Sequence, residues 1–329
     1  MQEELEWRPT ATLDVLRLRA RLLVRIREYF SHAGVLEVDT PVLSAAGTTD
    51  PAIQSFSTTY HGPGACNDAR LYLHTSPEFP MKRLLAAGAG SIYQICKVFR
   101  DGESGRRHNP EYTLLEWYRT GFDHVALMAE VESLLHAVLR DITPLATARY
   151  LTYRELFREY AGIDPFATTP VEIQQVLRSQ GITAPAGLPP DARDGWLHLL
   201  LTHVIEPSLD AGLVFISDYP ASQAALARLY PGVPPVAARF EVYLGGVELA
   251  NGYHELTDAA EQRQRFEQDN THRRTQGLAT VDPDRRLLAA MRSGLPDCAG
   301  VALGVDRLLM IANGSRHIDE VMAFPLNHA

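Results

Sequence analysis

Cysteine is scarce in this chain, and its three cysteines, Cys66, Cys96 and Cys298, lie far apart. This spacing excludes a disulfide framework and a clustered zinc site, so it favours a reducing cytoplasm and small buried thiols. Apolar runs of about 18 residues are also missing, which argues against a membrane span. The acidic start, residues 1–7, lacks the pattern of a secretory signal. We therefore expect a cytoplasmic protein with no membrane partner.

Positive charge is in deficit as well, with a formal net charge of −9 and a pI of about 5.7. No Lys/Arg-rich run occurs, whereas proteins that bind long nucleic acids usually show a basic patch. The composition therefore disfavours nucleic acid as the main partner. The length of 329 residues exceeds that of a typical domain but still allows one large domain.

The segment from residue 98 to residue 118 carries the strongest signal. Two alternating runs flank a polar loop, which is typical of a β-hairpin with a cationic loop. A guanidinium such as that of Arg100 neutralises phosphate oxygens and donates paired hydrogen bonds, so the loop can hold a triphosphate. Alternation places Glu116 and Tyr118 on one face of the second strand. Taken alone, the segment also fits a surface hairpin with ordinary charges.

A second hairpin is predicted where residues 240–244 and 247–250 flank two glycines. If the glycines form the turn, Tyr243 faces Glu248, and Glu241 becomes a diagonal neighbour of Glu248 at about 7–8 Å. Two carboxylates at that separation can share a divalent cation, and magnesium favours carboxylates together with phosphate oxygens. Two solvated acids on an outer face are the alternative interpretation.

Residues 299–313 read as an apolar strand, a glycine turn and a helix. Gly304 permits close approach of the backbone to a ligand. Arg307 lies in the first helical turn, where the helix dipole also favours anions. Together with Arg100, it suggests two arginines that bracket one triphosphate.

Periodicity predicts further helices at residues 13–33, 77–87, 125–139 and 259–274. The first has Thr12 as its expected N-cap, and Leu16, Leu23, Ile26 and Phe30 lie near one face. Residues 144–235 carry apolar residues at helical spacing, punctuated by prolines. We interpret this stretch as a helical insertion within the same domain.

Three segments, in this order, resemble the signature motifs of class II aminoacyl-tRNA synthetases: residues 34–41, 99–118 and 300–311. The lysine-specific branch is the most similar, through Ser76-Pro77-Glu78, the residues 108–111 and the residues 248–256. The resemblance implies an α+β fold in which helices flank a mainly antiparallel sheet. It also implies the use of ATP and Mg²⁺, and a homodimer whose interface includes the first motif.

Lysyl-tRNA synthetases carry an anticodon-binding barrel before the catalytic domain, whereas only about a dozen residues precede the first predicted helix here. We therefore expect a single catalytic domain over residues 1–329 and no stable tRNA binding. The compact form resembles a paralogous family, the elongation factor P–(R)-β-lysine ligases. That family activates (R)-β-lysine with ATP and transfers it to a lysine side chain of elongation factor P. A truncated enzyme that charges tRNA, and a non-catalytic paralogue that senses an amino acid or ATP, are the alternatives.

The resemblance also implies roles for individual residues. Arg100 is expected to hold the α-phosphate and the amino-acid carboxylate, and Arg307 the γ-phosphate, as the catalytic cations. The predicted ATP site comprises Arg100, Asp101, Gly102, Glu103, His108, Asn109, Glu248, Leu249, Gly304 and Arg307. The predicted amino-acid site comprises Ser76, Pro77, Glu78, Glu116, Tyr118, Asn251, Glu255 and Ala302. Glu241 and Glu248 are the predicted metal ligands.

Some positions depart from the synthetase pattern. Ser76 stands where lysyl-tRNA synthetases usually have alanine, and Ala302 where they usually have glycine, and both changes could reshape the amino-acid pocket. Gly102 stands where the second motif normally has glutamate. The adenine contact is therefore left either to backbone atoms or to Glu103.

One geometric problem concerns the second hairpin. Simple alternation puts Asn251 and Glu255 on the face opposite Glu248. If all three line one cleft, the strand must contain an irregularity, and Gly252 is the predicted site of a bulge or strand end.

Overall fold

The computed structural model describes residues 7–63, 69–183, 185, 187–209 and 211–329. Cys66 lies outside the described residues. The chain divides into two compact units. Unit 1 comprises residues 1–121, 137–143 and 257–329, and unit 2 comprises residues 122–136 and 144–256. The single domain expected from the sequence stays a prediction. None of the helices described is long and apolar enough to span a bilayer.

The described part of unit 1 combines strands of two sheets with several α-helices. The helices are α1 (Leu13–His32), α2 (Glu78–Ala86), α7 (Ala259–Thr275), α8 (Arg285–Gly294) and α9 (Val305–Asn313), and the turns η4 (Ile318–Glu320) and η5 (Leu326–His328) follow. Four strands of unit 1 are neighbours in one sheet, in the order β1 (Leu36–Glu37), β5 (Ile92–Phe99), β6 (Glu111–Thr120) and β12 (Cys298–Gly304). The smaller sheet has the strands β2 (Leu43–Ser44), β4 (Ala69–Leu73) and β3 (Ser57–Tyr60).

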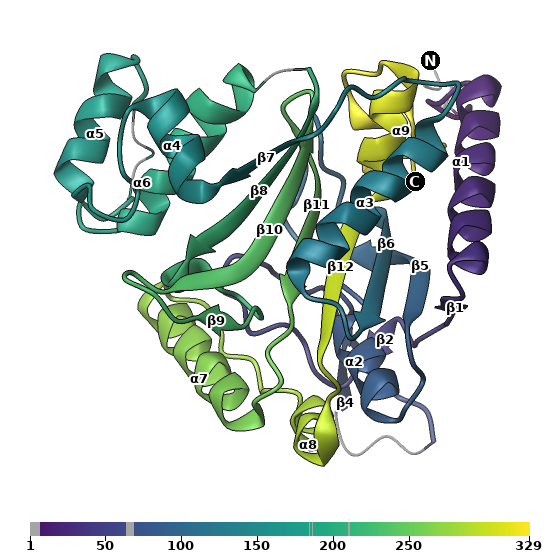
Figure 1. Cartoon of the computed structure of the whole chain (residues 1–329). Coiled ribbons are helices and arrows are strands. Elements are labelled where there is room, and N and C mark those ends of the chain that lie inside the picture. The colour runs from purple at the N-terminus through teal and green to yellow at the C-terminus, as the bar shows by residue number, and fades with distance from the viewer. Residues whose placement is uncertain (1–6, 64–68, 184, 186, 210) are drawn as a thin grey trace, which may run out of the picture. The chain divides into compact units, whose positions relative to one another are not determined.

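Helix α1 begins and ends as predicted, but its buried face differs from the expected one. The Thr12 hydroxyl accepts a hydrogen bond from Val15 N at 3.3 Å, so the N-cap is confirmed. The core side of the helix is formed by Val15, Leu18, Leu22, Ile26 and Phe30, whereas Leu16 and Leu23 are only partly buried. Several leucines on neighbouring positions made the sequence compatible with more than one face. Figure 1 shows α1 beside α9, in agreement with their contacts.

The hairpin predicted at residues 98–118 is confirmed as β5 and β6, which are longer than the sequence suggested. Phe99 pairs with Glu111 and Ile92 with Tyr118 in an antiparallel register. The Phe30 ring of α1 stacks on Tyr93 of β5 at a centroid distance of 4.4 Å. This aromatic contact fixes α1 against the strands that carry the cationic loop.

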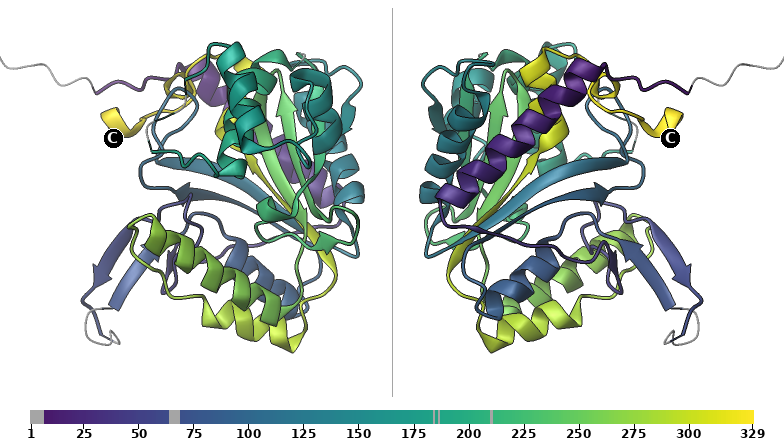
Figure 2. Two further views of the ribbon diagram at one scale, coloured as in Figure 1. Left: turned by 90° about the vertical axis from the view of Figure 1, so that its left-hand side faces the viewer. Right: turned by 90° about the vertical axis from the view of Figure 1, so that its right-hand side faces the viewer.

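Three helices of unit 1 pack side by side beneath the hairpin. Figure 2 shows α2, α7 and α8 together, with β3 and β4 projecting beside them. Phe79 of α2 meets Phe266 of α7 edge to face at 5.9 Å. This packing holds α2, whose first turn carries the predicted amino-acid ligand Glu78.

Unit 2 contains a second set of strands and the helices of the predicted insertion. Its helices are α3 (His124–Leu139, whose last turn belongs to unit 1), α4 (Tyr153–Ala161), α5 (Pro170–Ser179) and α6 (Arg193–Leu200), with the short turns η1 (Leu201–Ile205), η2 (Glu206–Ser208) and η3 (Ala221–Gln223). Its strands are β7 (Arg149–Thr152), β8 (Leu213–Pro220), β9 (Leu229–Tyr230), β10 (Val236–Leu244) and β11 (Val247–His254). Within unit 2, the strands β11, β10, β8 and β7 are neighbours in that order.

The purely helical character predicted for residues 144–235 is wrong, because β7, β8 and β9 lie within that range. Strand β8 is a nearly continuous buried run, so it lacks the alternation that identifies a half-exposed strand. The helices α4, α5 and α6 gather beside β7 and β8 in Figure 1. Their shared core includes Phe157, Leu177 and Leu197.

Candidate active site

The loop between β5 and β6 begins with a tight turn at Arg100. Gly102 has φ +81°, a left-handed conformation that glycine adopts readily, and Glu103 N donates to Arg100 O at 3.4 Å. The turn brings Glu103 Oε1 to 3.4 Å from Arg100 Nη1. The glycine that replaces the usual glutamate thus provides a turn, and the acid that follows it lies beside Arg100. Whether Glu103 contacts adenine stays a prediction.

The same loop supports Arg307, the second arginine that the sequence predicts to be catalytic. Arg307 Nη2 lies 2.7 Å from His108 Nε2. A guanidinium can only donate, so this histidine nitrogen must accept and the imidazole is neutral. Burial and then the charge of Arg307 lower the pKa of His108, which agrees with that state. His108 therefore orients Arg307 in addition to any contact of its own with phosphate.

Asn109 is engaged with backbone at both ends of its carboxamide. Its Nδ2 donates to Glu111 O at 2.7 Å, and its Oδ1 accepts from Leu326 N at 3.0 Å. Ile318 N donates to Arg106 O at 2.9 Å. Two backbone N–H groups of the C-terminal segment therefore donate to the cationic loop, one to the Arg106 carbonyl and one to the Asn109 side chain. The predicted contact of Asn109 with ATP stays a prediction, and its side chain also fixes the loop.

An ion pair between the buried Asp306 and the partly buried Arg19 positions the helix that carries Arg307. Asp306 accepts from Arg19 Nη1 at 2.6 Å through Oδ1 and from Thr113 N at 2.6 Å through Oδ2. Arg19 Nη2 also donates to the Thr113 hydroxyl at 2.7 Å. The network connects α1, β6 and the first turn of α9, so it fixes the position of the backbone that carries Arg307.

The predicted amino-acid ligands of unit 1 form one cluster around Glu116. Its Oε2 accepts from Ser76 Oγ at 2.7 Å, and its Oε1 accepts from Tyr118 OH at 2.7 Å. Ala302 of β12 is the direct cross-strand partner of Glu116. The two positions that depart from the synthetase pattern, Ser76 and Ala302, therefore both adjoin this carboxylate.

Glu78 lies next to this cluster and forms an ion pair with Lys82 of the same helix. Ser76 Oγ accepts from Glu78 N at 3.0 Å, and the buried Lys82 Nζ lies 2.5 Å from Glu78 Oε1. Burial, and then the charge of Glu78, raise the pKa of Glu116 from 4.5 to about 7, although the two hydroxyl donors and Lys82 oppose this shift. The surroundings of Glu116 therefore favour an added positive charge, because a cation would stabilise the ionised form of this carboxyl.

The β10–β11 hairpin has the predicted register at its turn. Tyr243 pairs with Glu248, and Glu241 pairs with Asn251, so one extra residue lies in β11 between these pairs. The bulge that the sequence required is therefore at Leu249, and its predicted position at Gly252 is wrong. Because the extra residue reverses the alternation, Glu248 and Asn251 lie on the same face as Glu241.

Glu241 is held by protein donors on both oxygens. Arg239 Nη2 donates to Oε1 at 2.5 Å and Tyr243 OH donates to Oε2 at 2.7 Å. Burial opposes ionisation, but the Arg239 charge and the hydroxyl donors outweigh it and lower the pKa of Glu241. The carboxylate is therefore charged at neutral pH, as a metal ligand must be.

The two acids fit a magnesium ion that takes most of its ligands from elsewhere. Glu248 lies diagonally across from Glu241 on the same face of the hairpin. In the described part of the chain, no group of three or more His, Cys, Asp or Glu side chains is arranged for a metal. Magnesium commonly retains water and phosphate oxygens around one or two carboxylates, so two are sufficient.

Asn251 has a defined orientation in the hairpin. Arg239 Nε lies 3.2 Å from Asn251 Oδ1, and Asn251 Nδ2 donates to Tyr253 OH at 2.7 Å. A guanidinium cannot accept, so the carbonyl end must face Arg239. Asn251 therefore offers N–H to a ligand, which suits a carboxylate better than the ammonium group expected from the sequence. The buried Glu255 remains an acidic candidate in unit 2.

Comparison with known proteins agrees with this geometry. The family model for class II tRNA synthetases (D, K and N) matches residues 2–328. The chain belongs to this family. A curated relative from Vibrio vulnificus, named elongation factor P–(R)-β-lysine ligase, is 50% identical to this chain. The match covers 97% of this chain and 98% of that protein. The relative of that name from Pasteurella multocida is 46% identical over the full length of both chains.

The predicted class II relationship and the α+β fold are thus confirmed. The roles of the individual site residues stay predictions. Two supporting residues were missed, although both have simple signals. Lys82 is four positions after Glu78 on a helix, and Arg239 is two positions before Glu241 on a strand.

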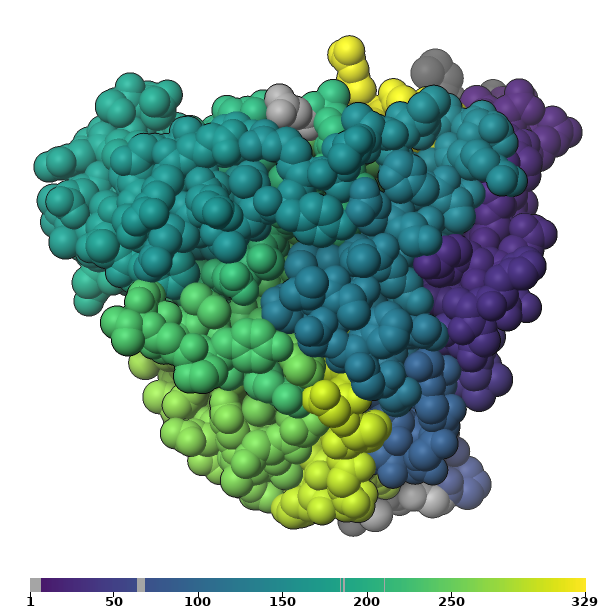
Figure 3. All heavy atoms as spheres, in the orientation of Figure 1, coloured from purple at the N-terminus to yellow at the C-terminus, as the bar shows by residue number. Residues whose placement is uncertain are grey.

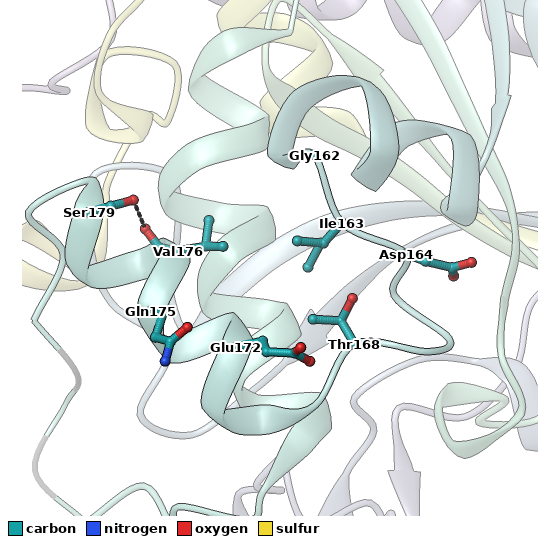
Figure 4. Close-up of a pocket in the computed structure, with 8 residues that line it drawn as sticks. All are labelled: Gly162, Ile163, Asp164, Thr168, Glu172, Gln175, Val176 and Ser179. Carbon is teal, nitrogen blue, oxygen red and sulfur yellow. Dashed lines mark hydrogen bonds between the residues drawn. The ribbon is translucent and has the colours of Figure 1, made fainter.

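An open depression of about 480 Å³ lies on the insertion helices of unit 2, apart from every predicted site residue. Figure 4 shows Ile163 and Val176 pointing toward each other across it. Its acids are already engaged, because Glu172 accepts from Thr169 at the start of α5 and Asp164 pairs with arginines of α4. We assign it no role in the chemistry.

Proposed function

We propose that this chain is an ATP-dependent ligase that activates (R)-β-lysine and joins it to a lysine side chain of elongation factor P. Relatives of that name align with nearly the whole chain at about 50% identity. The structural observation that carries the proposal is the Glu116 cluster, in which Ser76 and Ala302 both adjoin a buried acid. This is a site for an ammonium group, shaped by the two positions that depart from the synthetase pattern.

The first step is attack of an amino-acid carboxylate oxygen on the α-phosphorus of ATP, with release of pyrophosphate. Both reactants are anions, so the site must supply positive charge and orientation. Arg100 would hold the α-phosphate and the carboxylate, and Arg307, oriented by His108, would hold the γ-phosphate. Positioning and electrostatics can carry most of such a phosphoryl-transfer reaction.

Glu241 and Glu248 would hold magnesium, which neutralises phosphate charge when it is bound. Asp101, Gly102, Glu103, Leu249 and Gly304 would complete the ATP site. The Arg239 and Tyr243 donors keep Glu241 ionised and fixed.

The amino-acid substrate carries two ammonium groups and one carboxylate. Glu78, Glu116 and Glu255 would be the acidic partners of the ammonium groups, with Tyr118 as a hydroxyl partner. Asn251 would donate to the carboxylate, because its carbonyl end faces Arg239. Ser76, Pro77 and Ala302 would shape the pocket near Glu116.

The second step is attack of a protein lysine nitrogen on the adenylate carbonyl, which forms the amide and releases AMP. A free lysine has a pKa of about 10.4, so the amine must lose a proton first. We propose that a phosphate oxygen of the adenylate accepts this proton. No single acidic or histidine substitution should then abolish transfer while it spares adenylate formation, and a single-turnover assay of such variants tests this.

One incubation tests the function as a whole. The chain is mixed with ATP and Mg²⁺, with (R)-β-lysine or α-lysine, and with purified elongation factor P or tRNA. Intact-mass analysis should show one β-lysyl addition on elongation factor P, and Arg307→Ala should abolish it. Modification of tRNA alone would refute the proposal in favour of a truncated synthetase. Absence of any product and of pyrophosphate exchange would indicate a non-catalytic paralogue.

We also propose a homodimer built around the first motif, residues 34–41. Leu36 is 56% exposed and Leu43 is 47% exposed, although both are large apolar residues. Helix α1, purple in Figure 3, has an uncovered side in that view, and its apolar Val24 is 53% exposed. Light scattering should give twice the mass of one chain, and Leu36→Asp should reduce it to that of a monomer.

A further inference from the structure

Arg239 links two predicted ligand residues of unit 2. Its guanidinium donates to the Glu241 carboxylate at 2.5 Å through Nη2 and to Asn251 Oδ1 at 3.2 Å through Nε. Its third contact is from Nη1 to Gln223 O at 2.9 Å. The flat side of the group lies over the Tyr219 ring at 4.5 Å. Each of the three guanidinium nitrogens therefore donates a hydrogen bond, and the side chain is only 18% exposed.

These hydrogen bonds form a chain in which each donor fixes the orientation of the next side chain on the same strand face. Arg239 can only donate, so it fixes the carbonyl end of Asn251, and the Asn251 amide then donates to Tyr253 OH. Without Arg239, the two ends of the carboxamide could exchange places. Asn251 would then present an acceptor as readily as a donor, and an acceptor repels a carboxylate.

We propose that Arg239 is a positioning residue for the amino-acid site, which orients Asn251 as a hydrogen-bond donor toward the substrate carboxylate and holds Glu241 in place. This inference rests on the proposed function for the identity of the ligand. The residue acts through its neighbours and does not itself need to touch the substrate. Lysine could not replace it, because one ammonium group cannot span Glu241, Asn251 and Gln223 O in one plane.

The test separates position from stability by measuring binding in the absence of ATP and Mg²⁺. Calorimetric titration of the full chain with (R)-β-lysine is compared for wild type, Arg239→Met, Arg239→Lys and Asn251→Ala. Loss of a charge-assisted hydrogen-bond chain should weaken binding about 10- to 100-fold in Arg239→Met. Arg239→Lys should recover only part of this loss. Arg149→Met, which removes an arginine from a surface ion pair of the same unit, should bind like wild type.

The double variant Arg239→Met/Asn251→Ala decides whether Arg239 acts through Asn251. Its affinity for (R)-β-lysine should lie within about twofold of that of Asn251→Ala, since the effects of coupled residues are not additive. Additive losses, or wild-type affinity of Arg239→Met, would overturn the inference. If Arg239→Met does not fold, Arg239→Met/Glu241→Gln removes both buried charges and should restore folding without restoring affinity.

A readout without ligand keeps the inference separate from the proposed function. In a crystal structure of Arg239→Met at high resolution, the Asn251 carboxamide should turn over or occupy two orientations. An unchanged Asn251 would refute the inference whatever the substrate is. If wild type binds no (R)-β-lysine but Asn251 turns in the variant, the positioning role stands and the proposed substrate fails.

Discussion

Replacement of Glu116 by glutamine should stabilise unit 1 and weaken substrate binding at the same time. Glu116 is 2% exposed and receives one hydroxyl hydrogen bond on each oxygen, from Ser76 and Tyr118. Glutamine keeps the shape of the side chain but removes a charge that is isolated from water. Residues selected for ligand binding often destabilise the empty site, and this pocket has that character.

The magnitude follows from the raised pKa of Glu116, which moves from 4.5 to about 7 because of burial and the charge of Glu78. Since the folded pKa lies above the unfolded one, the stability linked to this group is present below 4.5 and is lost as the pH rises through about 7. At about 1.4 kcal/mol for each pKa unit, the ionised carboxylate opposes folding by roughly 3 kcal/mol above neutral pH. Glutamine should regain about 1–3 kcal/mol at pH near 8, because one hydroxyl must reverse its hydrogen bond.

Urea unfolding at two pH values measures this effect. In a Trp196→Phe background, the remaining tryptophans, Trp7 and Trp117, lie in unit 1, so fluorescence reports on that unit. The gain should be present at pH near 8 and nearly absent at pH near 5. Glu111→Gln, on the same strand but with its side chain 51% exposed, should change the unfolding free energy by less than about 0.5 kcal/mol at either pH.

Two outcomes would refute this reasoning. A loss of stability for Glu116→Gln at pH near 8 would mean that the carboxylate is a net stabilising group. An equal gain at both pH values would mean that ionisation is not its cause. Titration with (R)-β-lysine should show weaker binding to the variant, which separates a site for an ammonium group from a simple packing defect.

Three further predictions concern residues that support the site. Lys82→Met should destabilise unit 1 by about 3 kcal/mol because it leaves the Glu78 carboxylate without its cation, and a second change, Glu78→Gln, should return most of this loss in the same urea assay. Asp306→Asn should lower the unfolding free energy by about 3 kcal/mol and raise the KM for ATP, because it breaks the buried pair with Arg19 under α9. His108→Ala should raise the KM for ATP about tenfold in a pyrophosphate-exchange assay while the KM for the amino acid stays within about twofold, since it removes the hydrogen bond that orients Arg307 Nη2.

Local patterns in the sequence predicted those elements of the fold that depend on interactions between residues close together in the chain. Thr12, the turn of two glycines after Leu244 and the alternation before Tyr118 each act within a few residues. Strand β8 was missed because both of its faces are buried, and a continuous apolar run fits a helix as well as a strand. The difference between them lies in partners that are distant along the chain.

The candidate site shows the same limit. The sequence identified the acids and arginines from their motifs, but it did not show that Lys82 accompanies Glu78 or that both oxygens of Glu241 are occupied. Which protein donors satisfy a buried carboxylate depends on side-chain directions across neighbouring strands and turns. Spacing along one element suggests these contacts, but only the folded backbone decides them.

The bulge at Leu249 shows how one extra residue in a strand changes which side chains share a face of the hairpin. The sequence required an irregularity because Glu248 and Asn251 differ by an odd number of positions, and glycine was the obvious place for it. The structure instead leaves buried Leu249 unpaired, while Gly252 keeps its pairing with Phe240. A leucine side chain can anchor a bulge by packing, whereas glycine would offer no such anchor. The two acids and the amide therefore share a face because the extra residue lies between Glu248 and Ala250, at a buried leucine that the polar motif did not single out.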